Sequence, residues 1–290
     1  MKYVAPTTVE EASALLVDDP AARVFAGATD VIPQIRAGRP EPDTLVDLKG
    51  IERLVSIADD GSKWTIGAAV PTVRLGENEA LVAEFPGLVE AAGLIGSDQI
   101  QSRCTLGGNL CNASPAADSV PAMIANDVRA VIATATSSGP GTRTIPVADV
   151  VTGPGATSLA EGEFVVEFEL DHRPPSTGDA YLRMIPRTEM DIAVVGAGVR
   201  ISLDGQDVCT AASVVLGAVA PTAVRVAAAE AALIGSVIDD DVLAAVAQAA
   251  SAASNPIDDK RGTIAYRKQV AGVLAKRAVV AATERARGAK

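Results

Sequence analysis

At residues 26–30 the sequence contains Ala26-Gly27-Ala28-Thr29-Asp30, directly after the short apolar run Arg23-Val24-Phe25, which is typical of a strand that ends in a glycine turn. A second glycine segment is Thr105-Leu106-Gly107-Gly108-Asn109. Glycine has no Cβ atom, so backbone N–H groups in such turns can approach a phosphate closely. Spacing alone is weak evidence for a nucleotide, however, and ordinary tight turns explain both segments equally well.

Two common nucleotide motifs are absent from the sequence. No pair of glycines has the spacing of a Walker loop followed by Lys and then Ser or Thr. Gly196-Ala197-Gly198 lacks the third glycine of the dinucleotide fingerprint, and Ile201-Ser202-Leu203 continues as a strand where that motif needs a helix. A nucleotide bound here is therefore not expected to be held in the Rossmann manner.

Around the glycine segments, the first half of the chain is predicted to alternate helices and strands. Thr7 or Thr8 precedes a helical pattern as a cap, and Ser137–Gly141 has the composition of a hairpin loop. His172–Asp179, with two prolines, is the best linker candidate. The expected helices are at 9–16, 31–36, 81–95 and 120–126, and the expected strands are at 23–27, 45–48, 63–68, 128–135 and 163–170.

Beyond residue 179 the pattern changes from strands to helices. Strand-like segments at 192–203 and 211–216 are followed by alanine-rich helices that begin near Thr222, Asp239 and Gly262. A run of strands followed by a run of helices predicts an α+β second domain. The length of 290 residues also fits two folding units.

Composition excludes several classes of function. The net charge of -11 disfavours nucleic acid as a partner, and no apolar stretch reaches the roughly 20 residues of a membrane span. The three cysteines fit a reducing compartment, and the first residues lack the pattern of a secretory signal, so we expect a cytoplasmic location. A single histidine rules out a multi-histidine metal site. We accordingly predict no metal ligand and no catalytic residue in this chain.

The order of motifs resembles that of the FAD-binding medium subunit of molybdenum hydroxylases, the family of aerobic carbon monoxide dehydrogenase and bacterial xanthine dehydrogenases. The resemblance covers nearly the whole chain. Besides the two glycine segments, it includes Ala113-Ser114-Pro115-Ala116-Ala117-Asp118, Arg183-Met184-Ile185-Pro186-Arg187, Asp191-Ile192-Ala193-Val194-Val195, Gly217–Thr222, Asp259–Gly262 and Tyr266-Arg267.

The resemblance implies an α+β fold in two domains. Residues 1–173 would form an FAD-binding domain of the PCMH or vanillyl-alcohol-oxidase type. Residues 177–290 would form a carbon monoxide dehydrogenase flavoprotein-like C-terminal domain with a small antiparallel sheet and a helical bundle. With Asn112, whose short polar side chain suits a phosphate or a sugar hydroxyl, the implied cofactor contacts are Ala26, Gly27, Ala28, Thr29, Asp30, Thr105, Gly107, Gly108, Asn109, Asp118, Val165 and Arg183.

Three of these positions carry an alternative or a departure from the family pattern. Ala28 stands where a second glycine is usual, so we expect one close backbone approach either to be lost there or to be met by an αR or β conformation. Arg183 stands where many members have lysine, which keeps the charge but changes its shape. Asp118 precedes a predicted helix and could simply cap it.

The function implied is that of an electron-transfer subunit with noncovalent FAD. Electrons would pass from iron-sulfur clusters of a partner through FAD to an external acceptor. The molybdenum-pterin cofactor would lie on a large partner subunit and the 2Fe–2S clusters on a small one, in a dimer of heterotrimers. Two alternatives remain at this point: a stand-alone flavin oxidase of the same domain type, and an assembly subunit that has lost its flavin.

Overall fold

A small parallel sheet, in the order β1-β3-β2, forms the amino-terminal end of the molecule. The computed structural model describes residues 1–136 and 139–288. Thr8 caps the first helix by accepting a hydrogen bond of 3.1 Å from the N–H of Glu11. The elements of this part are β1 (Lys2–Val4), α1 (Val9–Asp18), β2 (Arg23–Phe25), α2 (Val31–Arg36) and β3 (Thr44–Asp47).

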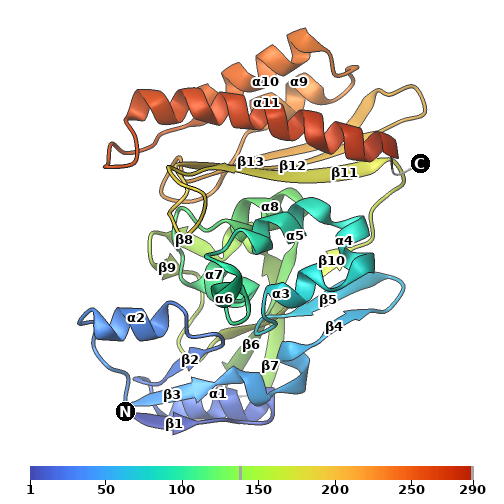
Figure 1. The fold of residues 1–290 in the computed structure, drawn as a ribbon. Coiled ribbons are helices and arrows are strands. Elements are labelled where there is room, and N and C mark those ends of the chain that lie inside the picture. The colour runs from blue at the N-terminus through green and yellow to red at the C-terminus, as the bar shows by residue number, and fades with distance from the viewer. Residues whose placement is uncertain (137–138, 289–290) are drawn as a thin grey trace.

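A five-stranded antiparallel sheet, in the order β4-β5-β10-β6-β7, lies at the centre of the first half (Figure 1). Its strands are β4 (Ile57–Asp59), β5 (Lys63–Gly67), β6 (Arg129–Thr136), β7 (Gly139–Pro146) and β10 (Phe164–Asp171), and β8 (Val151–Gly153) pairs separately with β9 (Ala156–Thr157). The helices between β5 and β6 are α3 (Val73–Gly76), α4 (Glu79–Glu84), α5 (Pro86–Gly93), α6 (Asp98–Gln101), α7 (Leu106–Cys111) and α8 (Ser119–Ala125).

Each face of the central sheet packs against a different layer. Phe168 packs with Leu88 of α5 and Met123 of α8 in one hydrophobic cluster. Phe164, on the same strand β10, packs with Leu16 of α1 in a second cluster. The sheet therefore holds the small parallel sheet on one side and helices α3–α8 on the other.

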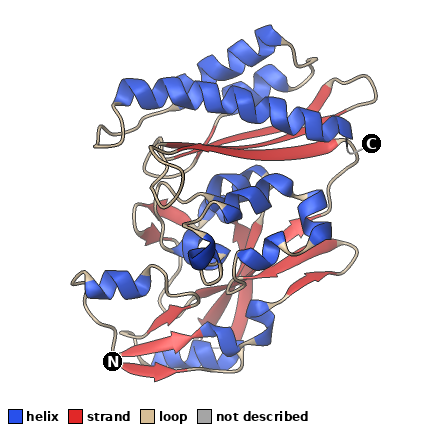
Figure 2. Cartoon of the chain, in the orientation of Figure 1, coloured by secondary structure: helices blue, strands red, loops and turns tan. Residues whose placement is uncertain are grey.

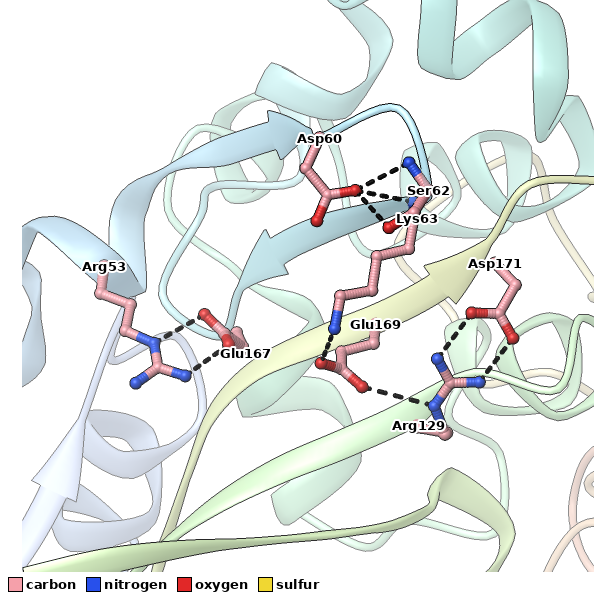
Figure 3. Close-up of polar contacts among 8 residues, drawn as sticks. All are labelled: Arg53, Asp60, Ser62, Lys63, Arg129, Glu167, Glu169 and Asp171. Atoms are coloured by element: carbon pink, nitrogen blue, oxygen red, sulfur yellow. Dashed lines mark hydrogen bonds and ion pairs between the residues drawn. The ribbon is translucent and has the colours of Figure 1, made fainter.

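Strand β10 also carries a row of acidic side chains, Glu167, Glu169 and Asp171, at alternate positions. Each is matched by a basic side chain from a neighbouring segment, as Figure 3 shows. The pairs are Arg53–Glu167, Lys63–Glu169 and Arg129–Asp171. These pairs link β10, the strand that carries Val165, to β5, to β6 and to the segment before β4.

The second half of the chain is one antiparallel sheet, in the order β11-β12-β13-β14, covered by three helices. Figure 2 shows helices on both sides of this sheet: α9–α11 on one side, and α5 and α8 of the first half on the other. The elements are β11 (Thr177–Met184), β12 (Val195–Leu203), β13 (Cys209–Gly217), β14 (Val224–Arg225), α9 (Ala227–Leu233), α10 (Asp240–Ala253) and α11 (Ile264–Gly288). The expected α+β fold is confirmed.

The two halves touch at backbone distance. A Cβ atom on Gly87 of α5 would lie 2.7 Å from the backbone of Ala180 on β11. A Cβ atom on Gly198 of β12 would lie 2.7 Å from the backbone of Pro121 on α8. Helices α5 and α8 therefore pack directly on the second sheet, and the side chains of β11 reach into the first half.

Two predicted segments of the first half differ from the structure. The helix expected at 81–95 is interrupted at Phe85, because Pro86 has no N–H to continue α4 and instead begins α5. Of the hairpin loop expected at 137–141, residues 137 and 138 lie outside the described part of the chain. For Gly139–Gly141 the loop prediction is wrong, because these residues begin β7 and pair with β6.

Two further differences lie in the second half. Residues 177–179, expected in a linker, begin β11, where Thr177 pairs with Ser202. The helix expected from Thr222 begins at Ala227, because Val224 and Arg225 first form β14 against β13.

Candidate functional site

The first glycine segment joins β2 to α2, as the sequence predicts, but Gly27 is needed there for packing. A Cβ atom at Gly27 would lie 1.7 Å from the carbonyl oxygen of Arg103, a distance that no side chain can tolerate. Arg103 and Cys104 directly precede the second glycine segment. Gly27 therefore brings the backbones of the two segments into contact.

Ala28, the next residue, has a φ of 61°. This left-handed conformation replaces the αR or β conformation expected from the sequence, so that expectation is wrong. An L-residue pays a steric penalty of roughly 1–2 kcal/mol in this region. The turn thus keeps the backbone path that glycine allows most easily, although the residue at this position is alanine.

The second glycine segment begins helix α7, so it is not a free-standing turn. Thr105 caps this helix by accepting a hydrogen bond of 2.9 Å from the N–H of Gly108. A Cβ atom on Gly107 would lie 2.5 Å from the carbonyl oxygen of Ala68, whereas one on Gly108 would meet only the Thr105 hydroxyl, at 3.2 Å. Gly107 is needed for packing, whereas a side chain at Gly108 would require only a small shift of the Thr105 hydroxyl.

A cavity of about 190 Å³ lies where the two segments meet. An adjoining cavity of about 130 Å³ shares Phe25, Ala26 and Gly108 with it and extends to Val165 on β10. Of the predicted site residues, the first cavity is lined by Ala26, Gly27, Ala28, Thr29, Asp30, Thr105, Gly108, Asn109 and Asn112, and the second by Ala26, Gly107, Gly108 and Val165. The fold thus gathers residues from three distant parts of the sequence.

Asp118 and Arg183 are placed together, outside the residues that line these two cavities. An Arg183 Nη atom donates to the Asp118 carboxylate at 2.8 Å, and the hydroxyl of Tyr181 donates to it at 2.9 Å. The side chain of Asp118 makes no capping bond to α8, so the simple helix-cap interpretation is wrong. Burial raises the pKa of Asp118, although Arg183 and Tyr181 oppose this shift.

Sequence reasoning missed Gln34 and Lys49, which stabilise the cavity from outside both segments. Gln34 of α2 donates a hydrogen bond of 2.8 Å to Asn112. The ammonium group of Lys49 donates to the carbonyl oxygen of Ala26 at 2.8 Å and lies 4.4 Å from the centre of the Phe25 ring. No sequence motif marks either residue, because both contacts depend on the tertiary fold.

The two cysteines near the second segment also line the first cavity. Burial raises the pKa of the Cys104 thiol, whose sulfur lies 3.2 Å from the hydroxyl of Thr72. A thiol with a raised pKa stays protonated near neutral pH and is a poor nucleophile. Among residues 1–136 and 139–288, no group of three or more His, Cys, Asp or Glu side chains is arranged to hold a metal ion.

A larger cavity of about 550 Å³ lies between the two halves, beside Ser114–Ala116. It is lined on the other side by Ile192, Ala218 and Arg267, from segments that carry the family resemblance. Arg267 is buried and donates hydrogen bonds to the carbonyl oxygens of Val194, at 2.7 Å, and Ala218, at 3.3 Å. These bonds hold the loops that line the cavity.

Gly108 is the residue whose position best fits a diphosphate, because it lines both smaller cavities and a Cβ atom there would contact only the Thr105 hydroxyl. The site lies in a first half built on two sheets, and this half is followed by an antiparallel sheet covered by helices. Residues 1–171 match the family model of the FAD-binding domain in molybdopterin dehydrogenase, and residues 180–282 match that of the carbon monoxide dehydrogenase flavoprotein C-terminal domain. The chain belongs to the family of FAD-binding subunits of molybdenum hydroxylases.

Individual relatives agree with this assignment. The carbon monoxide dehydrogenase medium chain of Hydrogenophaga pseudoflava is 33% identical over 286 residues, which are 98% of this chain and 97% of that protein. The xanthine dehydrogenase FAD-binding subunit of Escherichia coli O157:H7 is 32% identical over 231 residues, which are 79% of this chain and 77% of that protein. A solved structure of carbon monoxide dehydrogenase from Hydrogenophaga pseudoflava superposes with a TM-score of 0.92 at 34% identity, covering 98% of both chains.

The helices of residues 1–136 and 139–288 include none that is both long enough and apolar enough to cross a lipid bilayer. The longest, α11, has 25 residues, but several Lys and Arg side chains interrupt it.

Proposed function

We propose that this chain binds one noncovalent FAD and passes electrons from the 2Fe–2S clusters of a partner subunit to an external acceptor. The observation that carries the proposal is that the two glycine segments, 26–30 and 105–109, line one cavity. This cavity lies within the residues that match the FAD-binding domain family. Bound flavin can exchange electrons singly or in pairs, so it can connect one-electron clusters with a two-electron acceptor.

In this proposal, the residues of the two smaller cavities hold the diphosphate and the parts of the cofactor next to it. Gly108, which lines both cavities and has no side chain, admits the phosphates, and Thr29, Asn109 and Asn112 supply short polar side chains. Val165 provides an apolar contact at the far end. Asp118 and Arg183 form a charged pair that bonds a polar part of the cofactor. The domains are residues 1–173, which hold FAD, and 177–290.

The partners are proposed to be a large molybdenum-pterin subunit and a small 2Fe–2S subunit, in a dimer of heterotrimers. A typical 2Fe–2S cluster needs four thiolates, and this chain has three cysteines, so its own residues fall one short. The three thiols of this chain are free, which suits the reducing cytoplasm, the location we propose.

The two alternatives are less well supported. A stand-alone oxidase needs groups near the flavin that take a proton from its substrate. The only histidine, His172, is instead bonded to Glu84 and Asp59, and it does not line either of the two smaller cavities. A flavin-free assembly subunit rested on Ala28, and the left-handed φ of Ala28 keeps the path of a glycine turn.

The test is to purify the chain alone and together with the products of its neighbouring genes, and to assay dye reduction by candidate organic and gaseous substrates. We expect flavin in both preparations and substrate-dependent reduction only in the complex. Substrate-dependent turnover by the single chain, free of molybdenum and iron, would favour the stand-alone oxidase and refute the subunit proposal.

A further inference from the structure

One face of β11 carries three polar side chains that all contact the first half of the chain. Asp179, Tyr181 and Arg183 stand at alternate positions, so they point to the same side of the strand. Tyr181 and Arg183 bond to Asp118, at the start of α8. Asp179 accepts a bond of 2.9 Å from Asn126, the residue that ends α8. Helix α8 is thus tied to β11 at both ends.

Asp179 is the most completely bonded of these side chains. It is 1% exposed. Its carboxylate accepts hydrogen bonds from the backbone N–H groups of Gly87, at 2.9 Å, and Leu88, at 3.0 Å, in the first turn of α5. Arg173 forms an ion pair with it at 2.9 Å. A buried carboxylate with this many donors is held in one place, because any shift would leave buried polar groups without partners.

The lengths of the two tied elements match. The helical segment from Asp118 to Asn126 rises about 12 Å, and the strand from Asp179 to Arg183 rises about 13 Å. Both ends of α8 can therefore be bonded to β11 in this register. A shift of β11 by one residue would turn all three side chains to the opposite face. The contacts of Asp179 therefore determine where Arg183 lies.

We propose that Asp179 is a positioning residue for the FAD site, which fixes β11 so that Arg183 and Tyr181 meet Asp118. It acts through that pair and does not touch the cofactor. This proposal rests on the proposed function, in which Asp118 and Arg183 contact FAD. Its consequence is that a change at Asp179, at the far end of α8, alters FAD binding and the environment of the flavin.

The experiment is a double-mutant cycle on the full chain. The dissociation constant for FAD is measured by titrating FAD into flavin-free protein, and the midpoint potential of the bound flavin is measured in parallel. We expect Asp179→Asn and Arg183→Gln each to weaken FAD binding about tenfold, and the double variant to be no more than about threefold weaker than Arg183→Gln alone, since coupled residues give non-additive effects. Asp179→Asn should also shift the potential in the same direction as Arg183→Gln.

Two further variants separate positioning from general destabilisation. Glu230→Gln removes a carboxylate that accepts bonds from the Val214 N–H and Arg225, within the second half of the chain. It should lower the melting temperature and leave FAD affinity unchanged. Asn126→Ala removes one of the bonds to Asp179, together with the Asn126 bonds to Arg173 and to the carbonyl oxygen of Ala122, and leaves the Asp179 carboxylate in place. It serves if Asp179→Asn does not fold, and it should weaken FAD binding about threefold and non-additively with Arg183→Gln.

Each outcome decides the matter. Additive losses in the double variant, or wild-type affinity and potential in Asp179→Asn, would overturn the positioning role while leaving the proposed function intact. If Asp118→Asn and Arg183→Gln both bind FAD as the wild type does, the pair does not contact the cofactor. That result would reject this part of the proposed site, and the positioning role with it.

Discussion

Gln34 donates a hydrogen bond of 2.8 Å to Asn112, across the cavity that the two glycine segments line. Asn112 is the residue that ends α7, so this bond ties α2 to the end of α7. The side-chain oxygen Oε1 of Gln34 accepts hydrogen bonds from Arg39, at 3.1 Å, and Arg23, at 3.3 Å. The bond thereby holds α2 and the end of α7, which are far apart in sequence, together at one side of the cavity.

Replacing Gln34 with alanine should loosen this closure. We expect the free energy of unfolding to fall by about 0.5–1.5 kcal/mol, the usual contribution of one hydrogen bond, because the bond to Asn112 is partly buried and the other two are exposed. FAD should also dissociate faster. Urea unfolding and the rate of flavin fluorescence increase on dilution measure the two effects. Gln99→Ala is the control, because Gln99 is exposed and accepts only a local bond from Ser97. Equal dissociation rates in wild type and Gln34→Ala would show that the bond does not retain the cofactor.

Ala28→Gly should stabilise the protein. Relief of the left-handed strain gains about 1–2 kcal/mol, and the extra freedom of glycine in the unfolded chain costs about 0.5–1 kcal/mol. The expected net gain therefore lies between about 0 and 1.5 kcal/mol, centred near about 0.75 kcal/mol, and is measured by urea unfolding. Ala37→Gly, at an exposed residue with a φ of −81°, should instead destabilise the chain. If both variants lose stability equally, the strain at Ala28 is absent.

The glycines of the two segments should respond differently to substitution. Gly108→Val should leave a folded chain that no longer binds FAD, because the side chain enters the cavity. Gly27→Ala should fail to fold normally, since its Cβ atom would meet the backbone of Arg103. Circular dichroism and flavin absorbance together distinguish the two results. Full FAD occupancy in Gly108→Val would place the diphosphate elsewhere.

The acidic row on β10 should make stability depend on acid pH. The hydrogen bonds of Arg129 hold the pKa of Asp171 below its ordinary value. A carboxylate with a lowered pKa stabilises the fold above its ordinary pKa, near 3.8, and this stabilisation is lost as the pH falls through the lowered value. Arg129→Gln should cost about 1 kcal/mol at pH 7, because its partners are partly exposed.

The measurement is the melting temperature of wild type and Arg129→Gln from pH 7 to pH 2. The difference between the two proteins should shrink below about pH 4, as the carboxylates lose their charge. A difference that stays constant over this range would show that the ion pairs of Arg129 contribute nothing to stability.

The local parts of the fold could be predicted from the sequence because their signals are local. Thr8 and the capping pattern that follows it predict α1. The helix predicted at 31–36 has the same bounds as α2 in the structure. Strand β7 was not predicted because Gly139, Pro140 and Gly141 are typical of loops. They form a strand only because they pair with β6. The first residues of β11 were not predicted for a similar reason, because they form a strand only by pairing with β12.

At the candidate site, motif order predicted which segments meet, but not how each residue serves. Gly27, Gly107 and Gly108 are the same residue type in the sequence. In the structure, Gly27 and Gly107 pack against backbone atoms, whereas Gly108 faces only the Thr105 hydroxyl. Ala28 was expected in a common conformation because β and αR cost an alanine nothing. Gln34 and Asp179 carry no local signal at all, since their partners lie far away in the chain.

The central claim is that the FAD diphosphate lies between the two glycine segments, and a crystal structure of the chain with bound FAD tests it most directly. Both phosphates are expected within hydrogen-bonding distance of residues 26–30 and 105–109, next to Gly108. A diphosphate found elsewhere, for instance in the cavity beside Ser114–Ala116, would contradict it.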